Sequence, residues 1–206
     1  MIQRILQKIC LMSAGLLIMG CASLEDNSVL DIAPSKVHVD AGTVAPSKQT
    51  ISIGKINDFR GEENERFVMY KYDEANNQIG GAYIAKRHMV DIIGSSLSNN
   101  LQQAHYRIRK NRAHYVLTGN LIDLDLVWKN TTLQSKLKGD LQLQLMLTDQ
   151  RTGQQVWRQE FNATAYYKSA SLSDSASIKA VTENLIDEVV KQLEHSQGFR
   201  QALRTL

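Results

Sequence analysis

The most regular hydrophobic pattern in the chain runs from residue 133 to residue 149. Apolar side chains occupy alternate positions over most of this stretch, and Gln, Lys and Asp fill most of the positions between them. A period of two predicts a β-strand with one buried and one solvated face, as in antiparallel sheets. A second alternating run, residues 155–167, follows a turn sequence at 149–153. Together the two runs predict a long β-hairpin over residues 133–167.

Residues 113–128 also alternate, but the parity of the apolar positions changes within the run. Apolar residues fall on odd numbers up to Leu117 and on even numbers from Ile122. A slip of one residue turns every later side chain to the opposite face of a sheet, and a β-bulge can absorb such a slip. Gly119 lies at the change, so we predict a bulge there.

Two longer segments repeat apolar residues every three or four positions, which is the spacing of one helix face. They predict helices over residues 85–104 and 175–194, with a short third helix over 198–203. Short apolar runs predict further strands at 50–56 and 106–109. Because each helix buries one stripe and the sheet one face, both helices pack most economically on the same side. We therefore expect an α+β fold: a two-layer sandwich, with a mostly antiparallel sheet and two main helices on one face.

Residues 61–82, between the first strand and the first helix, are the least regular part of the domain. They contain a short run with alternating aromatics, 67–72, and a strong turn signal at 76–81. A connection of this length in a compact domain is commonly functional or mobile. The sequence therefore indicates either a partner-binding surface or a hairpin without a role of its own. The candidate partner-binding residues are Asp58, Arg60, Phe67, Tyr70, Tyr72, Gly80 and Gly81.

The first twenty residues have the three parts of a secretory signal. Arg4 and Lys8 make a positive start, residues 9–19 an apolar core, and Gly20 a small residue at the cleavage site. The apolar core is about 11 residues long, whereas a membrane-spanning helix needs roughly 20. A cleaved signal peptide is therefore favoured over an uncleaved anchor helix.

The segment Ile18-Met19-Gly20-Cys21 resembles the lipobox of bacterial lipoproteins. The resemblance implies cleavage between Gly20 and Cys21, a diacylglycerol on the Cys21 sulfur, and acylation of the new amino terminus. Ala22, rather than Asp, follows the cysteine, which in Gram-negative lipoproteins implies the outer membrane. We therefore expect a lipid-anchored protein on the periplasmic face of that membrane. Cleavage at an ordinary secretory site, leaving Cys21 unmodified, is the alternative.

These features divide the chain into a signal peptide (1–20), a lipidated N-terminus with a flexible tether (21–48), and one α/β globular domain (49–206). Both prolines of the chain lie in the tether, and its hydrophobic spacing is irregular. A flexible chain of this length has a root-mean-square span of roughly 25–30 Å. The alternative is that part of this segment packs along the domain.

Charge and cysteine content narrow the classes of function. Removing residues 1–20 removes two basic residues, so the formal net charge falls from +3 to +1. No Lys/Arg cluster of the kind that follows a phosphate backbone occurs, so we expect no nucleic-acid partner. The basic run 107–112 is interpreted as a solvated turn, or else as a contact patch for an anionic surface. The domain has no cysteine and its histidines lack metal-ligand spacing, so we expect no disulfide, metal or cofactor.

Several segments together resemble the YajG-like family of bacterial envelope lipoproteins. They are the lipobox at Cys21, the strand at 51–53 leading into Asp58-Phe59-Arg60, the Gly80-Gly81 pair, and Tyr115–Gly119. The segments 113–119 and 149–157 are also similar to the LpoB-type activators of peptidoglycan synthases and to CsgG-like domains. The YajG-like resemblance implies a location and a shape, but no activity.

The favoured hypothesis is a non-enzymatic accessory or adaptor lipoprotein that binds an unidentified envelope protein. The alternatives are a small-ligand or lipid carrier, which needs a cavity between sheet and helices, and an activator of a peptidoglycan synthase. A hydrolase would need convergence of groups such as Asp58, Arg60 and His88, and no Gly-x-Ser-x-Gly elbow is present. Asp123 and Asp125 have the spacing of paired carboxylates on one strand face, but a solvated face accounts for them.

Overall fold

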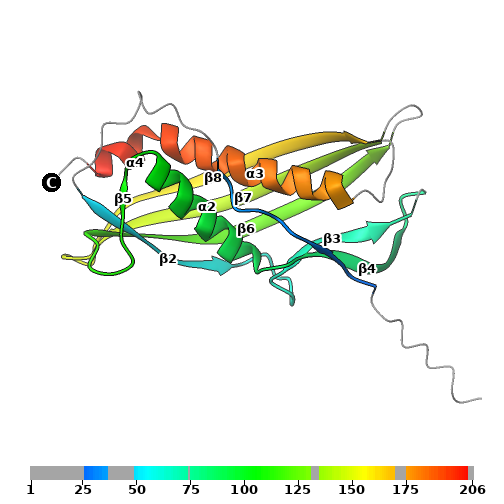
Figure 1. Cartoon of the computed structure of the whole chain (residues 1–206), viewed down its shortest axis with the longest axis horizontal. Helices are drawn as coiled ribbons and strands as arrows, with labels where there is room; N and C mark the ends of the chain where they lie inside the picture. The colour runs from blue at the N-terminus through cyan, green and yellow to red at the C-terminus, as the bar shows by residue number, and fades with distance from the viewer. Residues whose placement is uncertain (1–25, 37–48, 74, 131–134, 170–174, 204–206) are drawn as a thin grey trace, which may run out of the picture.

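The computed structural model describes residues 26–36, 49–73, 75–130, 135–169 and 175–203. A five-stranded sheet in the order β5-β2-β6-β7-β8 forms one layer, and two long helices cover one of its faces (Figure 1). Its strands are β2 (Thr50–Asp58), β5 (Arg107–Ile108), β6 (Tyr115–Asn130), β7 (Ser135–Asp149) and β8 (Gln155–Ser169). The helices are α2 (Met89–Gln103), α3 (Ser175–His195) and the short α4 (Gln197–Ala202). The predicted α+β sandwich with two main helices on one face is confirmed.

The long strands of the sheet pair antiparallel, as predicted. β7 lies between β6 and β8 and runs antiparallel to both. β2 instead lies parallel to β5 and to β6. Parallel neighbours need a long crossover connection, and here the segment between β2 and β5 supplies it, passing through two more strands and α2. β5 pairs only with Thr50 and Ile51, so it covers only the start of β2.

The core lies between the sheet and the two long helices. The inward positions of β7 are fully buried, whereas the alternate positions Gln142 and Gln144 are half-buried on the open face. The apolar stripe of α3 packs against β7 and β8. The alternation that predicted the strand therefore also identified its buried face. The fully buried leucines of β7 are Leu137, Leu143, Leu145 and Leu147.

The bulge in β6 is not at Gly119, so this prediction was wrong in position. Gly119 pairs in regular register with Leu145, and the register shifts between Leu121 and Asp123. A Cβ at Gly119 would lie 2.8 Å from Leu145 Cδ2 and 2.9 Å from the Gln144 carbonyl oxygen. The glycine therefore permits close packing on the buried face. Ile122 takes up the slip, which leaves it half-buried rather than in the core.

The first helix begins later than predicted, at Met89 rather than at residue 85. Ala85 is the last residue of a strand, and its N–H donates to the Arg66 carbonyl at 2.6 Å. The backbone at Ala85 is therefore committed to sheet pairing. The apolar periodicity of the helix continues by chance into this strand end.

A second, smaller sheet lies beside the first at one end of the molecule (Figure 1). Its order is β1-β4-β3, and its strands are β1 (Ser28–Leu30), β4 (Gln78–Ala85) and β3 (Phe67–Tyr72). β3 and β4 form the irregular hairpin that the sequence predicted. β1 was not predicted, and it runs parallel to β4. We call this three-stranded element the small sheet.

Residues 26–36 pack along the domain, so the predicted flexible tether is wrong for this segment. After β1, Ile32 is buried, and Ala33 donates its N–H to Glu183 Oε1 of α3 at 2.8 Å. The N–H of Ser35 donates to Ser96 Oγ at 2.8 Å, and Asn100 Nδ2 donates to the Ser35 carbonyl at 3.0 Å. The segment therefore contacts both main helices after it leaves the small sheet.

Candidate functional site: a concavity on the small sheet

The small sheet is hollowed on the face that it turns away from the core. Ladder pairs place Phe67 beside Ile84 and Tyr70 beside Ala82 on this face. Above them opens a concavity of about 500 Å³, bounded by β3, β4 and the loop that joins β2 to β3. We call it the hairpin concavity. Its lining includes Asn27, Glu62, Phe67, Tyr70, Ile79 and Gly81.

Apolar side chains in the hairpin concavity reach solvent. The rings of Phe67 and Tyr70 pack with their centroids 4.7 Å apart. Tyr70 is 42% exposed and Ile79 is 45% exposed. Large side chains of this kind, grouped in a hollow rather than scattered, are typical of surfaces that bind proteins.

The rim of the hairpin concavity is acidic. Glu62 and Glu63 both line it, on the loop between β2 and β3. Among the described residues, neither carboxylate forms an ion pair or a hydrogen bond. The hairpin concavity therefore combines exposed apolar side chains with two unpaired carboxylates.

Arg60 braces the loop that forms this rim. Its Nη2 and Nε donate to the two carboxylate oxygens of Asp58 at 2.6 and 2.9 Å, and both side chains are buried. Arg60 Nη1 also donates to the Phe67 carbonyl at 2.7 Å, and Nη2 to the Glu65 carbonyl at 3.2 Å. The guanidinium therefore ties the end of β2 to the start of β3. Bidentate pairs of this type are among the stronger polar contacts in proteins.

Gly81 is needed for the close approach of the N-terminal segment. It has φ +89°, and a Cβ there would lie 2.5 Å from the Asp26 carbonyl oxygen. Lys71 Nζ donates to the same oxygen, and the Asn27 side chain accepts from the Ala82 N–H at 2.9 Å. Gly80, in contrast, has open space around it. We call the contacts of Lys71, Gly81 and Ala82 with residues 26 and 27 the N-terminal clamp.

The structure brings together four of the seven predicted partner-binding residues. Phe67, Tyr70, Gly80 and Gly81 line the hairpin concavity. Asp58 and Arg60 lie behind it as the brace of the loop. Tyr72 lies outside it, because it pairs with Gln78 and packs against the core. The role of these seven residues in binding stays a prediction. The predicted cleavage and lipidation site, Gly20 and Cys21, lies outside the described residues.

Sequence reasoning did not single out several residues of the concavity, among them Asn27, Glu62 and Ile79. Glu62 stands in an acidic run and Ile79 in the turn signal, so both were within the irregular region without being singled out. Asn27 gave no signal, because it reaches the site through parallel pairing with a strand far along the chain.

A second hollow, of about 1000 Å³, lies between β2 and α2. It contains Asp58 and His88, which sequence reasoning had considered as members of a hydrolase site. Asp58 is paired with Arg60, and His88 Nδ1 lies 2.5 Å from Glu65 Oε2 at the surface. Each group therefore already has a partner within the chain.

The carboxylates of Asp123 and Asp125 lie on the open face of the sheet. Both residues are exposed, and the pair stands next to Asp140 of β7. Partial burial, with Asp123 and Asp140 nearby, raises the pKa of Asp125. In the described part of the chain, no three His, Cys, Asp or Glu side chains are grouped so that they could hold a metal ion. The predicted solvated face therefore accounts for these residues.

The sequence matches no protein-family profile and no curated protein at a significant level. Its fold is similar to that of a Xanthomonas campestris protein of family DUF330, with 13% identity and a TM-score of 0.56, over 87% of this chain and 98% of that one. This similarity establishes the fold alone.

Two bacterial lipoproteins are more distant neighbours. A minor lipoprotein from Acinetobacter baumannii is 9% identical, with a TM-score of 0.46 over 74% of this chain and 94% of its own. Lipoprotein GNA1162 from Neisseria meningitidis is 13% identical, with a TM-score of 0.38 over 72% and 99%. At these scores the likeness adds no argument about function. Among the described residues, no helix has the length and apolar content to cross a membrane.

Proposed function

We propose that this chain is a lipid-anchored accessory lipoprotein of the bacterial outer membrane, which acts by binding another envelope protein and not by catalysis. The observation that carries the proposal is the hairpin concavity. It gathers Phe67, Tyr70 and Ile79 beside an acidic rim, in a part of the fold where folding alone does not require exposed apolar side chains. A protein segment with basic and apolar residues is the occupant that this surface fits.

The location rests on the N-terminal sequence. Cys21 stands at the end of a lipobox-like segment, Ala22 follows it, and the chain resembles the YajG-like envelope lipoproteins in several short motifs. Acylation at Cys21 would place the domain on the periplasmic face of the outer membrane. Two or more acyl chains make such anchoring stable, since one chain alone gives only reversible binding.

The carrier alternative finds no support at the centre of the layer between the large sheet and the two long helices, away from the open hollow between β2 and α2. Ile93, Leu141 and Val189 meet there, and no volume remains between them for even a water-sized molecule. The apolar side chains of this layer pack against one another. The hairpin concavity, which is open and partly polar, remains the better candidate for binding.

The proposal is tested by site-specific photocrosslinking in cells that produce the full chain. A photoreactive amino acid at Ile79 should capture one defined envelope protein. The matched control is Val156, which is similarly exposed but lies on β8 of the large sheet. The capture should be lost when Tyr70→Ala is combined with the Ile79 probe. Capture of only abundant bystanders, or equal capture from both positions, would contradict the proposal.

A second measurement tests the anchor separately from the partner. Cys21→Ser should leave residues 49–206 folded but release the protein from the membrane fraction. Intact-mass analysis of the parent should show acyl groups on Cys21. Unchanged membrane retention of the variant would remove the basis for the proposed location.

A further inference from the structure

Asp26, the first residue that the structure describes, is held against the small sheet. The carbonyl oxygen of Asp26 accepts from Lys71 Nζ and lies against Gly81, and the Asp26 carboxylate is 3.5 Å from the same ammonium. One residue later, Asn27 Oδ1 accepts a hydrogen bond from the Ala82 N–H. The N-terminal clamp therefore fixes the chain at residues 26 and 27.

The residues that follow are held equally well. β1 pairs with β4 through Leu30, whose carbonyl accepts from the Lys86 N–H at 2.8 Å. Leu30 and Ile32 are each 4% exposed and belong to the main core. Pulling residues 26–36 away would expose this apolar surface and break backbone hydrogen bonds. The segment cannot serve as a spacer between the membrane and the domain.

We infer that the small sheet is seated at the lipid surface, close to the acylated cysteine, and that the domain stands on the membrane in one orientation. The inference rests on the proposed acylation of Cys21. Four residues lie between Cys21 and Asp26, and the five residue-to-residue steps span at most about 18 Å when fully extended. The lipid surface is therefore the neighbour of the small sheet, rather than of any other part of the domain.

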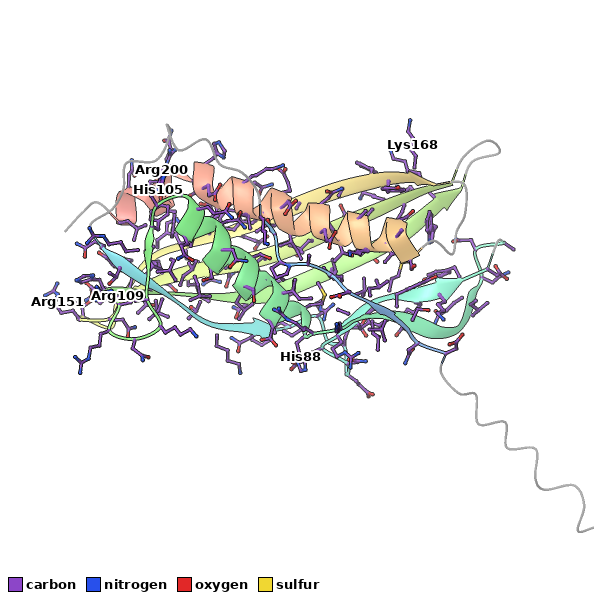
Figure 2. All side chains as sticks on the ribbon, in the orientation of Figure 1. His88, His105, Arg109, Arg151, Lys168 and Arg200 are labelled. Atoms are coloured by element: carbon purple, nitrogen blue, oxygen red, sulfur yellow. The ribbon has the colours of Figure 1, made fainter. Side chains whose placement is uncertain are left out.

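This orientation is opposite to the one that charge alone would favour. Figure 2 shows Arg109 and Arg151 at the end of the molecule away from β3 and β4. That end also carries exposed Arg107, Lys110 and Arg112. Anionic lipids would attract this basic end if the tether were long. The short anchor instead points the basic end away from the membrane and places the hairpin concavity at the level of the membrane surface.

The orientation can be measured on vesicles with short-range quenching. The mature, acylated protein is reconstituted in vesicles of phosphatidylethanolamine and phosphatidylglycerol that contain a headgroup spin-labelled lipid. A fluorescent amino acid is placed at Gln78 on the small sheet or at Arg151 at the opposite end; both positions are exposed. The expected result is quenching several-fold stronger at Gln78 than at Arg151.

Lengthening the anchor is the matched control. An insertion of about 20 Gly and Ser residues between Ser23 and Leu24 adds a root-mean-square span of roughly 25 Å. Quenching at Gln78 should then fall toward the value at Arg151. Equal quenching at the two positions without the insertion, or stronger quenching at Arg151, would overturn the inference.

A second preparation separates this inference from the proposed function. Unacylated chain 21–206 is coupled through the Cys21 thiol to a maleimide lipid in the same vesicles, so that the geometry is measured whether or not cells acylate the cysteine. An unacylated parent by mass would count against the proposed anchor alone. Equal quenching in the coupled preparation would count against the seated orientation alone.

Discussion

The two sheets of this protein are built differently, although they share one core. The strands β6, β7 and β8 are 16, 15 and 15 residues long and pair almost without interruption. The strands of the small sheet have 3, 6 and 8 residues, and the β3–β4 ladder shifts register twice. The large sheet is regular where it supports the fold. The small sheet is irregular where it forms the hairpin concavity.

The difference indicates that the large sheet supplies most of the stability, whereas the small sheet carries the candidate binding surface. The inner face of the small sheet, including Val68, Met69 and Tyr83, joins the same core as the large sheet. Within the part of the chain that the structure describes, no second layer covers its outer face, and Tyr70 and Ile79 are exposed there. Few buried contacts and short ladders permit local opening below the free energy of global unfolding. We therefore expect the small sheet to exchange its amide protons faster than β7.

The largest effect should follow from a cavity in the large sheet. Leu143 is fully buried at the centre of β7, and Leu143→Ala should lower the free energy of unfolding by about 3–5 kcal/mol. The loss should appear in both sheets together, because they share one core. Urea unfolding monitored by circular dichroism measures it. The control Val156→Ala, at an exposed position, should change stability by less than about 0.5 kcal/mol. A loss confined to β7 would contradict the shared core.

The next effect concerns the brace of the small sheet. Arg60→Ala leaves the buried Asp58 carboxylate without its partner, which should lower the free energy of unfolding by about 3 kcal/mol. It should also loosen the loop between β2 and β3, so amide exchange in residues 59–67 should rise more than in β7. Combining it with Asp58→Asn should recover part of the stability, because no unpaired charge then remains. Failure of the double variant to recover any stability would indicate that Arg60 acts through packing alone.

The same contrast explains what could be predicted from sequence. The alternation along β7 reports a local property, burial of every second side chain, so strand, face and hairpin were all predicted. The bulge was placed at Gly119 because the parity of the apolar positions changes there, but Gly119 makes room for Leu145, and Ile122 carries the slip. The alternation locates such a slip only to within a few residues.

The small sheet was harder to predict, for a physical reason. β1 is three residues long and has almost no periodicity of its own. It becomes a strand only because β4, more than fifty residues further along the chain, offers it an edge. The aromatics Phe67 and Tyr70 were found because they lie in a local run. Asn27 reaches the same hollow through long-range pairing, which no local pattern encodes.

A smaller effect should come from Glu194, in the helix layer over the large sheet, and this effect on stability should depend on pH. Glu194 of α3 is 2% exposed, and neither of its carboxylate oxygens has a hydrogen-bond partner among the described residues. Burial raises its pKa from 4.5 to about 7. The folded chain therefore keeps a proton that the unfolded chain has already released, so stability is highest below pH 4.5 and falls as pH rises to about 7.

Glu194→Gln removes this titration. Its stability relative to the parent should rise by about 2–3 kcal/mol between pH 4.5 and pH 8. Thermal or urea unfolding at several pH values gives the difference directly. Because the group lies in the shared core, the change should appear in global unfolding and not only in the small sheet. A pH-independent difference between parent and variant would mean that Glu194 is ionised in the folded protein.

The smallest effect should come from the N-terminal clamp, and it should be local. Lys71→Ala removes the ammonium that holds the Asp26 carbonyl, and should lower global stability by about 1 kcal/mol or less. Hydrogen exchange should nevertheless rise clearly in residues 26–30, whereas peptides from β7 should keep their protection. Lys136→Ala is the matched control, because Lys136 of β7 lies over the Tyr166 ring at 3.8 Å on the large sheet. A uniform rise in exchange across both sheets would contradict the view that the small sheet opens independently. It would also show that Lys71 does not hold residues 26–30 locally.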